Sequence, residues 1–411
     1  MKNLFYNTWA LFFGFSLLCL GHGLQGTLIG VRATIEGFSF FSTGLVIAGY
    51  YIGYLLGSIF VPFFLKRVGH IRVFAALASS ASIAILLHTI FLDPFFWFFI
   101  RIITGASIAG IFIVMESWLN DKSNNTNRGK MLSTYMIVTF TFVGLGQFLL
   151  NLSEPIKVDL FILVSILLSL SLIPILLSIS KAPNFENPKR ISFKQLYIIS
   201  PLGFVGALAI GLSHGTIFGY GAVYAASKGL SIFNISLFMF IVIFFGAIFQ
   251  WPVGLLSDKI DRRIILIACS LAASIIAILI TISFYLSLTI FFILSAIFAG
   301  MSLPIYSLVV AHTNDFLQPD EIIETSAAIS ILVGVGLVLG PLSVSLFMSV
   351  FGTDGFFIHL FAVHLILAFY GIYRLAKRVK PSDIESQYTP LPRNITPAGM
   401  ELNPKVESTE D

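Results

Sequence analysis

Residues 254–263 read GLLSDKIDRR, and five of these ten residues are charged: Asp258, Lys259, Asp261, Arg262 and Arg263. The stretches on either side, 232–254 and 264–282, contain no charged residue. Each flank has about the length of a helix that crosses a bilayer, which takes about 20 residues. The pattern therefore indicates two membrane helices joined by a short charged loop.

The same alternation of apolar runs and short polar loops covers most of the chain. Of its 411 residues, 57% are apolar and 11% are charged, and the mean hydropathy is +0.95, whereas soluble domains carry about 25% charged residues. Membrane β-strands would give runs of about ten residues with alternating polarity, so the longer runs predict an all-α integral membrane protein. Twelve spans are expected at 8–30, 42–65, 73–92, 94–119, 131–152, 159–180, 197–226, 232–256, 264–283, 288–311, 325–350 and 355–373.

The placement of basic residues predicts how the chain sits in the bilayer. With both termini inside, 20 of the 24 Lys and Arg residues fall on the inner side, Arg101 lies within a span, and Arg32, Lys157 and Lys228 fall outside. Such an excess on one side follows the positive-inside rule. We therefore expect a multi-pass protein of a bacterial inner membrane with cytoplasmic termini. This charge pattern is a topology signal and does not indicate a nucleic-acid partner.

The chain divides into two similar halves. Six spans lie in 1–180 and six in 197–374, with an inter-bundle loop at 181–196 on the cytoplasmic side, and the polar, proline-containing tail 375–411 is expected to be disordered. Three segments of the first half match segments 192 residues later: LGHG at 20–23 with LSHG at 212–215, VGL at 143–145 with VGL at 335–337, and the loop at 62–72 with that at 254–264. Internal repeats of this kind are typical of secondary transporters whose site lies between the halves.

At this point the residues resemble a known family. Gly254, Asp258, Lys259, Arg262 and Arg263 resemble the G-x-x-x-D-R/K-x-x-R/K-R/K signature of the major facilitator superfamily, and ESWLN at 116–120, VGHIR at 68–72 and QWPVGLLSDKIDRR at 250–263 are similar to its YcaD-like branch. The resemblance implies two pseudo-symmetric six-helix bundles and alternating access. It does not supply a substrate.

Polar residues within spans are the candidates for the transport pathway. Arg101 is expected to face the bundle interior, because an Arg exposed to lipid near the middle of the bilayer is costly; the alternative is an Arg that reaches back to the outer interface. The family would make Arg101 a contact for protons or for an anionic substrate. Glu116 and Asn120 share one face near the inner end of the same span, where they could form a gate or simply lie at the interface.

The paired histidines form a second candidate group. His22 and His214 occupy matching positions in the first span of each half, and Gln25 follows His22 on the same face. Imidazole can bind or relay a proton near neutral pH; the alternative is a neutral histidine in a tight helix contact. Weaker candidates for lining a cavity are Gln147, Gln250 and Tyr224.

The charged loops predict two cytoplasmic latches of opposite polarity. Asp258, with Arg262 and Arg263 beside it, would face Arg128 or Lys130 at the start of span 5. Lys66 or Arg67 would face acidic residues at the start of span 11, which are Asp320, Glu321 and Glu324. The alternative is that the basic residues serve only the positive-inside rule.

Taken together, these features predict a monomeric secondary transporter of a small organic molecule, coupled to protons, with no cofactor and no metal. No nucleophile–base pair, phosphate loop or metal cluster stands out, so an enzyme is not expected. Two alternatives stay open: an uncoupled facilitator, and a membrane sensor or scaffold that has the fold but does not transport.

Overall fold

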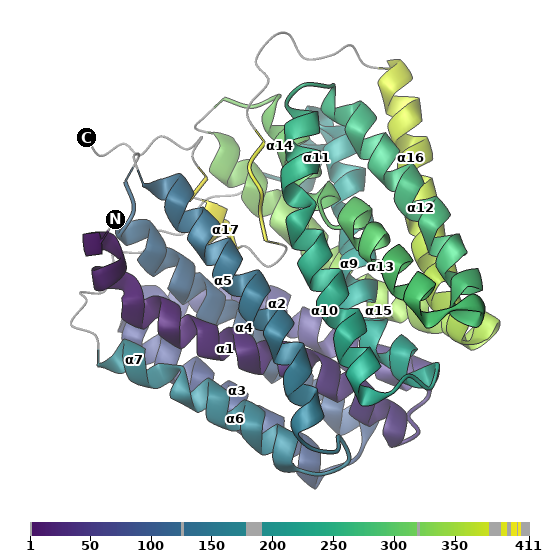
Figure 1. The fold of residues 1–411 in the computed structure, drawn as a ribbon. Coiled ribbons are helices and arrows are strands. Elements are labelled where there is room, and N and C mark those ends of the chain that lie inside the picture. The colour runs from purple at the N-terminus through teal and green to yellow at the C-terminus, as the bar shows by residue number, and fades with distance from the viewer. Residues whose placement is uncertain are drawn as a thin grey trace.

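A computed structural model describes residues 2–124, 127–177, 191–318, 321–377, 388–392, 396–400 and 402–403. Within these residues every regular element is a helix. Figure 1 shows two groups of long helices, one purple to teal from the first half of the chain and one teal to yellow from the second. The expected all-α architecture with two six-helix bundles is confirmed.

The first bundle contains six spans. Its elements are α1 (Lys2–Ile35), α2 (Phe40–Val68), α3 (His70–Ile90), α4 (Pro94–Asp121), α5 (Arg128–Phe148) with the short η1 (Leu149–Leu152), and α6 (Asp159–Leu170) continued by α7 (Leu172–Leu176).

The second bundle repeats this plan. Its elements are the short α8 (Phe193–Ile199), α9 (Pro201–Ser227), α10 (Ile232–Ile248) continued by α11 (Gln250–Ser257), α12 (Arg262–Leu286), α13 (Leu288–Ser302) continued by α14 (Ile305–Asn314), α15 (Ile322–Phe351), the turn η3 (Gly352–Asp354) and α16 (Gly355–Lys377). A further short helix, α17 (Pro397–Met400), lies in the tail.

Eleven helical stretches of the described chain are long and apolar enough to cross a membrane. One of them, at 322–377, contains both α15 and α16, which are joined at η3. Counting those two helices separately gives the twelve spans expected from the sequence. Several helices extend beyond the expected spans, as α1 does at both ends. Span 7 instead starts later than expected, because Ser200 caps the start of α9 and Pro201 occupies its first turn, so residues 197–199 end α8.

Three spans are interrupted, and each break lies beside a proline. Proline lacks the N–H group that continues a helix and clashes with the preceding turn. Pro174 lies in α7, Pro252 lies near the start of α11, and Pro304 immediately precedes α14. These breaks bend the spans without ending them.

The bundles meet through equivalent helices. α1 packs against α9, α2 against α15, and α5 against α10. In terms of spans these pairs are 1 with 7, 2 with 11 and 5 with 8, so exchanging the two halves reproduces the same set of contacts. The arrangement is therefore pseudo-symmetric, and the face shared by the bundles is formed by the first, second and fifth spans of each.

A close contact at Gly105 positions Arg101, the charged residue within the fourth span. A Cβ at Gly105 of α4 would overlap the carbonyl oxygen of Tyr50 on α2, so the two backbones touch at this point. Arg101 lies one turn before Gly105 and therefore shares its face. The motif Arg101-x-x-x-Gly105 thus brings the guanidinium group of Arg101 against α2.

The tail departs from the expectation of disorder. Its described residues lie inside the molecule: Leu391, Met400 and Leu402 are at most 1% exposed. Figure 1 shows this yellow segment between the two bundles, at the end of the molecule where the N-terminus lies. The polar composition of the tail was misleading, because its backbone and hydroxyl groups hydrogen-bond to helix side chains, as described below. Residues 378–387, 393–395, 401 and 404–411 of the tail lie outside the described residues.

Candidate functional site

Arg101 is buried between the bundles and faces an aromatic ring instead of a carboxylate. It is 5% exposed, and its guanidinium carbon lies 4.4 Å from the centre of the Tyr50 ring. Its Nε has no hydrogen-bond partner, and no acidic side chain forms an ion pair with it in the part of the chain that the structure describes. A cation–π contact contributes about 2 kcal/mol or more when desolvated, but it brings no negative charge to the guanidinium group. The positive charge of Arg101 is therefore only partly compensated.

Arg101 lines a cavity, the Arg101 cavity, which lies on the shared face of the two bundles. Its wall comes from both halves, with Tyr51 and Gln147 from the first and Phe218 and Met239 from the second. The cavity holds about 50 Å³, whereas sites for small molecules hold roughly 300–1,000 Å³. The Arg101 cavity is therefore smaller than a typical small-molecule site.

Two side-chain amides line the Arg101 cavity, and they differ in their hydrogen bonding. Gln147 is fully engaged: it accepts from Thr27 and donates to the carbonyl oxygens of Gly23 and Val143 at 3.1 and 3.0 Å. Gln25 is 1% exposed, and neither its Oε1 nor its Nε2 has a hydrogen-bond partner among the described residues. A buried amide without partners costs about 1–3 kcal/mol. Gln25 thus has donor and acceptor capacity facing the cavity together with Arg101.

The two repeat-matched histidines meet at a second cavity, the two-histidine cavity, of about 40 Å³. His22 and His214 both line it, together with Gln250, Tyr306 and Leu391. His22 also lines the Arg101 cavity and stacks on Tyr50 with ring centres 6.0 Å apart. His22 therefore lines both cavities, and it shares the Arg101 cavity with Gln25 and Arg101.

Glu116 and Asn120 lie apart from these cavities. Glu116 is completely buried, and its carboxylate accepts hydrogen bonds from the hydroxyl of Tyr135 at 2.7 Å and from the backbone amide of Thr396 at 3.0 Å. The hydroxyl of Thr396 also donates to it. Glu116 is fifteen residues from Arg101 on one helix, which is about 22 Å. The carboxylate thus holds the tail and does not compensate Arg101.

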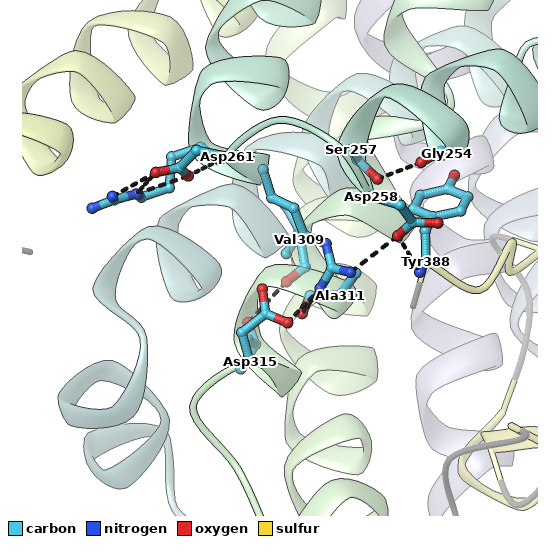
Figure 2. A network of polar contacts seen from close by, with 11 residues as sticks. Gly254, Ser257, Asp258, Asp261, Val309, Ala311, Asp315 and Tyr388 are labelled. Carbon is cyan, nitrogen blue, oxygen red and sulfur yellow. Dashed lines mark hydrogen bonds and ion pairs between the residues drawn. The ribbon is translucent and has the colours of Figure 1, made fainter. Parts of the chain in front are cut away.

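The charged loop forms a network within the second half (Figure 2). Arg262 is 3% exposed; it forms ion pairs with Asp258 and Asp315 and donates to the carbonyl of Ala311. Asp258 also accepts from the backbone amide of Tyr388 at 2.7 Å. The Arg262 side chain therefore ties the loop to α14, and Asp258 ties the loop to the tail.

A second pair caps α12. Asp261 accepts from the backbone amide of Arg263 at 2.9 Å and from its guanidinium at 2.6 Å. Burial alone would raise the pKa of Asp261, but these bonds from Arg263 outweigh it and hold the pKa below its usual value. Asp261 is therefore an ionised cap at the start of this helix.

The expected latches are not joined as the sequence suggested. Asp258 has Arg262 and Tyr388 as its partners, and neither Arg128 nor Lys130 is among them, because the next turn and the tail already supply donors to its carboxylate. Lys66 and Arg67 are exposed, and no ion pair between described residues joins them to Glu321 or Glu324. Asp320 lies outside the described residues.

Four residues that contact the predicted site residues were not identified from the sequence. Tyr50 supports Arg101, Asp315 pairs with Arg262, and Tyr388 and Thr396 bring the tail to both bundles. Asp315 could have been found from its position directly after an apolar run, as a charge with no basic neighbour nearby. Tyr50 carried no signal, because aromatic residues make up 14% of the chain.

These features define a class: a membrane protein of two similar six-helix bundles, with polar cavities at their shared face, has the architecture of a secondary transporter with internal repeats. A family model described as "Major Facilitator Superfamily" matches residues 11–313 and 203–405. The chain belongs to the major facilitator superfamily.

Its relatives agree with this assignment. The chain is 25% identical over 355 residues to an uncharacterized MFS-type transporter YcaD of Escherichia fergusonii, which covers 86% of this chain and 92% of that protein. It is 26% identical over 362 residues to the corresponding protein of Escherichia coli strain HS, with the same coverage.

Solved structures share the fold. A mutant form of the nucleoside transporter NupG matches with a TM-score of 0.74 at 12% identity, covering 89% of this chain and 98% of that one. A bacterial homologue of the human lysosomal transporter Spinster, in an inward-facing and occupied conformation, matches with a TM-score of 0.70 at 14% identity, covering 92% of this chain and 98% of that one.

Proposed function

We propose that this protein is a proton-coupled secondary transporter that moves a small organic anion through the Arg101 cavity by alternating access. The observation that carries the proposal is the buried guanidinium of Arg101, which lines an inter-bundle cavity and has no carboxylate partner among the described residues. A charge buried in a membrane protein without a partner is costly. A substrate that brings a carboxylate or phosphate would provide the missing partner.

The amide of Gln25 supports the same assignment. Its Nε2 can donate to an anionic oxygen, and its Oε1 can accept from a hydroxyl or amine of the substrate. Charge-assisted hydrogen bonds from Arg are among the strongest that proteins make to carboxylates and phosphates. Because the cavity is smaller than a typical small-molecule site, the bundles must separate before a substrate enters.

The experiment that tests the substrate class is a ligand screen by thermal shift on the purified protein. The probes are small monocarboxylates, dicarboxylates, phosphate esters, neutral nucleosides and amines. An anion is expected to stabilise the wild-type protein and Arg72→Gln, which removes an exposed cation outside the cavity, but not Arg101→Gln. Stabilisation by neutral or cationic compounds alone, or equal stabilisation of Arg101→Gln, would contradict the proposal.

Proton coupling is assigned to His22 and His214, because both line one cavity between the halves. Imidazole is the side chain that ordinarily changes charge between about pH 5 and 8. With the anion identified, transport into proteoliposomes should depend on pH in that range, and replacing both histidines with Gln should flatten the profile. An unchanged profile would assign coupling elsewhere.

The proposed orientation places the end that carries loop 258–261 in the cytoplasm of a bacterial cell, together with both termini. The support is the excess of basic residues at that end. Alkaline phosphatase fused after Arg378 is expected to be inactive in a bacterial host, while a fusion after Lys157 is expected to be active. The reverse result would invert the topology.

A further inference from the structure

The tail segment, by which we mean the described residues between 388 and 403, occupies the space between the bundles at the end of the charged loops. Thr396 is 2% and Asn403 1% exposed, and the apolar side chains of the segment are buried as well. The tail segment is therefore enclosed by helices and does not lie on the surface of the protein.

One part of the tail segment binds the second half. The backbone amide of Tyr388 donates to Asp258 at 2.7 Å, and its hydroxyl donates to Gln250 on α11. A Cβ at Gly254 would overlap the Tyr388 ring, so the ring lies directly on the backbone there. Gly254 and Asp258, two positions of the family signature in the charged loop, thus form the binding site for Tyr388 (Figure 2).

The next part turns toward the middle of the molecule. The amide of Leu391 donates to the hydroxyl of Ser307 on α14 at 3.0 Å. The Leu391 side chain is 1% exposed and lines the two-histidine cavity. This leucine therefore closes the cavity on the side of the charged loops.

The last part binds the first half. Thr396 donates to Glu116 of α4 through both its amide and its hydroxyl. The short helix α17 that follows contacts α4 and α15. Thr396 thus provides most of the hydrogen bonds that the Glu116 carboxylate accepts, and the hydroxyl of Tyr135 provides another.

We propose that the tail segment is a removable plug that holds the two bundles together at the cytoplasmic end and must withdraw before the cavities open to the cytoplasm. Its two anchors are on different bundles, Tyr388 on Asp258 and Thr396 on Glu116. Separation of the bundles at this end would move the two anchors apart, so the tail segment would have to leave at least one of its present positions. The helix surfaces that contact the tail segment offer hydrogen-bond acceptors to its donors, namely the carboxyl groups of Asp258 and Glu116 and the hydroxyl of Ser307. Such surfaces suit a polar peptide segment and do not suit lipid.

The plug rests on the proposed function only in requiring that the bundles separate at this end. Its test needs no substrate, so a failure of the anion proposal leaves it untouched. Cys19 and Cys269 are buried and are first replaced by Ala. A single cysteine is then placed at Phe140, which lines the two-histidine cavity, and its reaction with a membrane-impermeant maleimide is followed in inside-out vesicles.

Three chains are compared: the full chain, a chain ending at residue 387, and a full chain carrying Tyr388→Ala with Thr396→Ala. The matched control is a full chain in which the order of residues 388–403 is scrambled. Labelling is expected to be about tenfold faster or more without the plug, because the shortened chain loses the hydrogen bonds from the tail to Asp258, Ser307 and Glu116. The double substitution is expected to fall between the full and shortened chains, and the scrambled chain to behave like the shortened one.

Adding a synthetic peptide of residues 386–411 to the shortened chain should slow labelling again. Equal labelling of the full, shortened and doubly substituted chains would overturn the proposal. So would a shortened chain that labels at the full-chain rate but melts at a lower temperature, because the tail would then be a permanent strap. The doubly substituted chain keeps the test decisive if the shortened chain fails to fold.

Discussion

The two copies of the charged loop perform the same task with different chemistry. His70 and Arg262 are 192 residues apart and stand at the start of equivalent helices, α3 and α12. His70 hydrogen-bonds to Ser117 of α4 at 2.9 Å, while Arg262 pairs with Asp315 and with the carbonyl of Ala311 at the end of α14. Each residue therefore ties its loop to the fourth span of its own half, one through a neutral contact and one through an ion pair.

The difference shows that duplication preserved the geometry and not the charge. The same separation holds for the interior: the positions 192 residues after Arg101 and Glu116 are Ile293 and Leu308, which are apolar. The first half thus carries two buried ionisable side chains, Arg101 and Glu116, that have no counterpart in the second half. The second half carries the ion-paired loop, in which Arg262 joins Asp258 and Asp315.

The largest expected effect on this comparison comes from Arg262→Ala. Arg262 is 3% exposed and the Asp315 side chain 5% exposed, and removing one partner of a buried ion pair costs about 3–5 kcal/mol because the other charge is left unpaired. The free energy of unfolding in detergent should fall by that amount. Combining Arg262→Met with Asp315→Leu should recover most of it, and a failure to recover would mean that the charges have a role beyond their pairing.

His70→Ala is expected to have a smaller effect. It removes one neutral hydrogen bond to Ser117, worth about 0.5–1.5 kcal/mol, and a ring contact with Trp118 whose centres are 5.7 Å apart. The loss of stability, measured by the same unfolding assay, should be less than half of that for Arg262→Ala. Equal losses would show that the two copies are energetically equivalent, which would remove the contrast between them.

Asp261→Asn should be weaker still and should depend on pH. Because the pKa of Asp261 is held below its usual value by Arg263, its ionised form stabilises the fold above the ordinary value of about 3.9. That contribution is lost as the pH falls through the lower folded-state value. At neutral pH the variant should be less stable by about 0–1 kcal/mol, as for a partly exposed pair. The difference should shrink as the pH is lowered below 4, and a difference that grows instead would contradict this origin.

The smallest change in stability is expected from Lys66→Glu. Lys66 is exposed and has no ion pair with Glu321 or Glu324, so the fold should be altered by less than about 0.5 kcal/mol. The proposed latch between this loop and the start of α15 would then act only in another conformation. If it does, Lys66→Glu should speed labelling of the cysteine at Phe140 and Glu321→Lys should restore it; no change in either variant would exclude the latch.

The spans could be predicted closely from the sequence, and the reason is physical. The bilayer requires about 20 apolar residues per helix, so hydropathy alone located all twelve, including those interrupted at Pro174, Pro252 and Pro304. The expectation that a costly charge faces the interior placed Arg101 away from lipid, but it did not predict that His22, Gln25 and Arg101 would line one cavity.

The partners of these residues could not be predicted in the same way. One partner of Asp258 is the backbone amide of Tyr388. Every residue except proline has such an amide, so amino-acid composition does not reveal which one will bind. The tail was expected to be disordered because its side chains are polar. Hydropathy does not show that helix residues such as Glu116 and Ser307 accept hydrogen bonds from the tail. Long-range hydrogen bonds to backbone groups are invisible to sequence patterns.

The central claim is that the Arg101 cavity is the route of transport, and the most direct test is substrate exchange in proteoliposomes. The anion found in the ligand screen is loaded inside, and the entry of its radiolabelled form is measured for the wild-type protein, Arg101→Gln and Arg72→Gln. Exchange by the wild-type protein and Arg72→Gln, with none by folded Arg101→Gln, is the predicted result. Exchange by Arg101→Gln at the wild-type rate would contradict the claim.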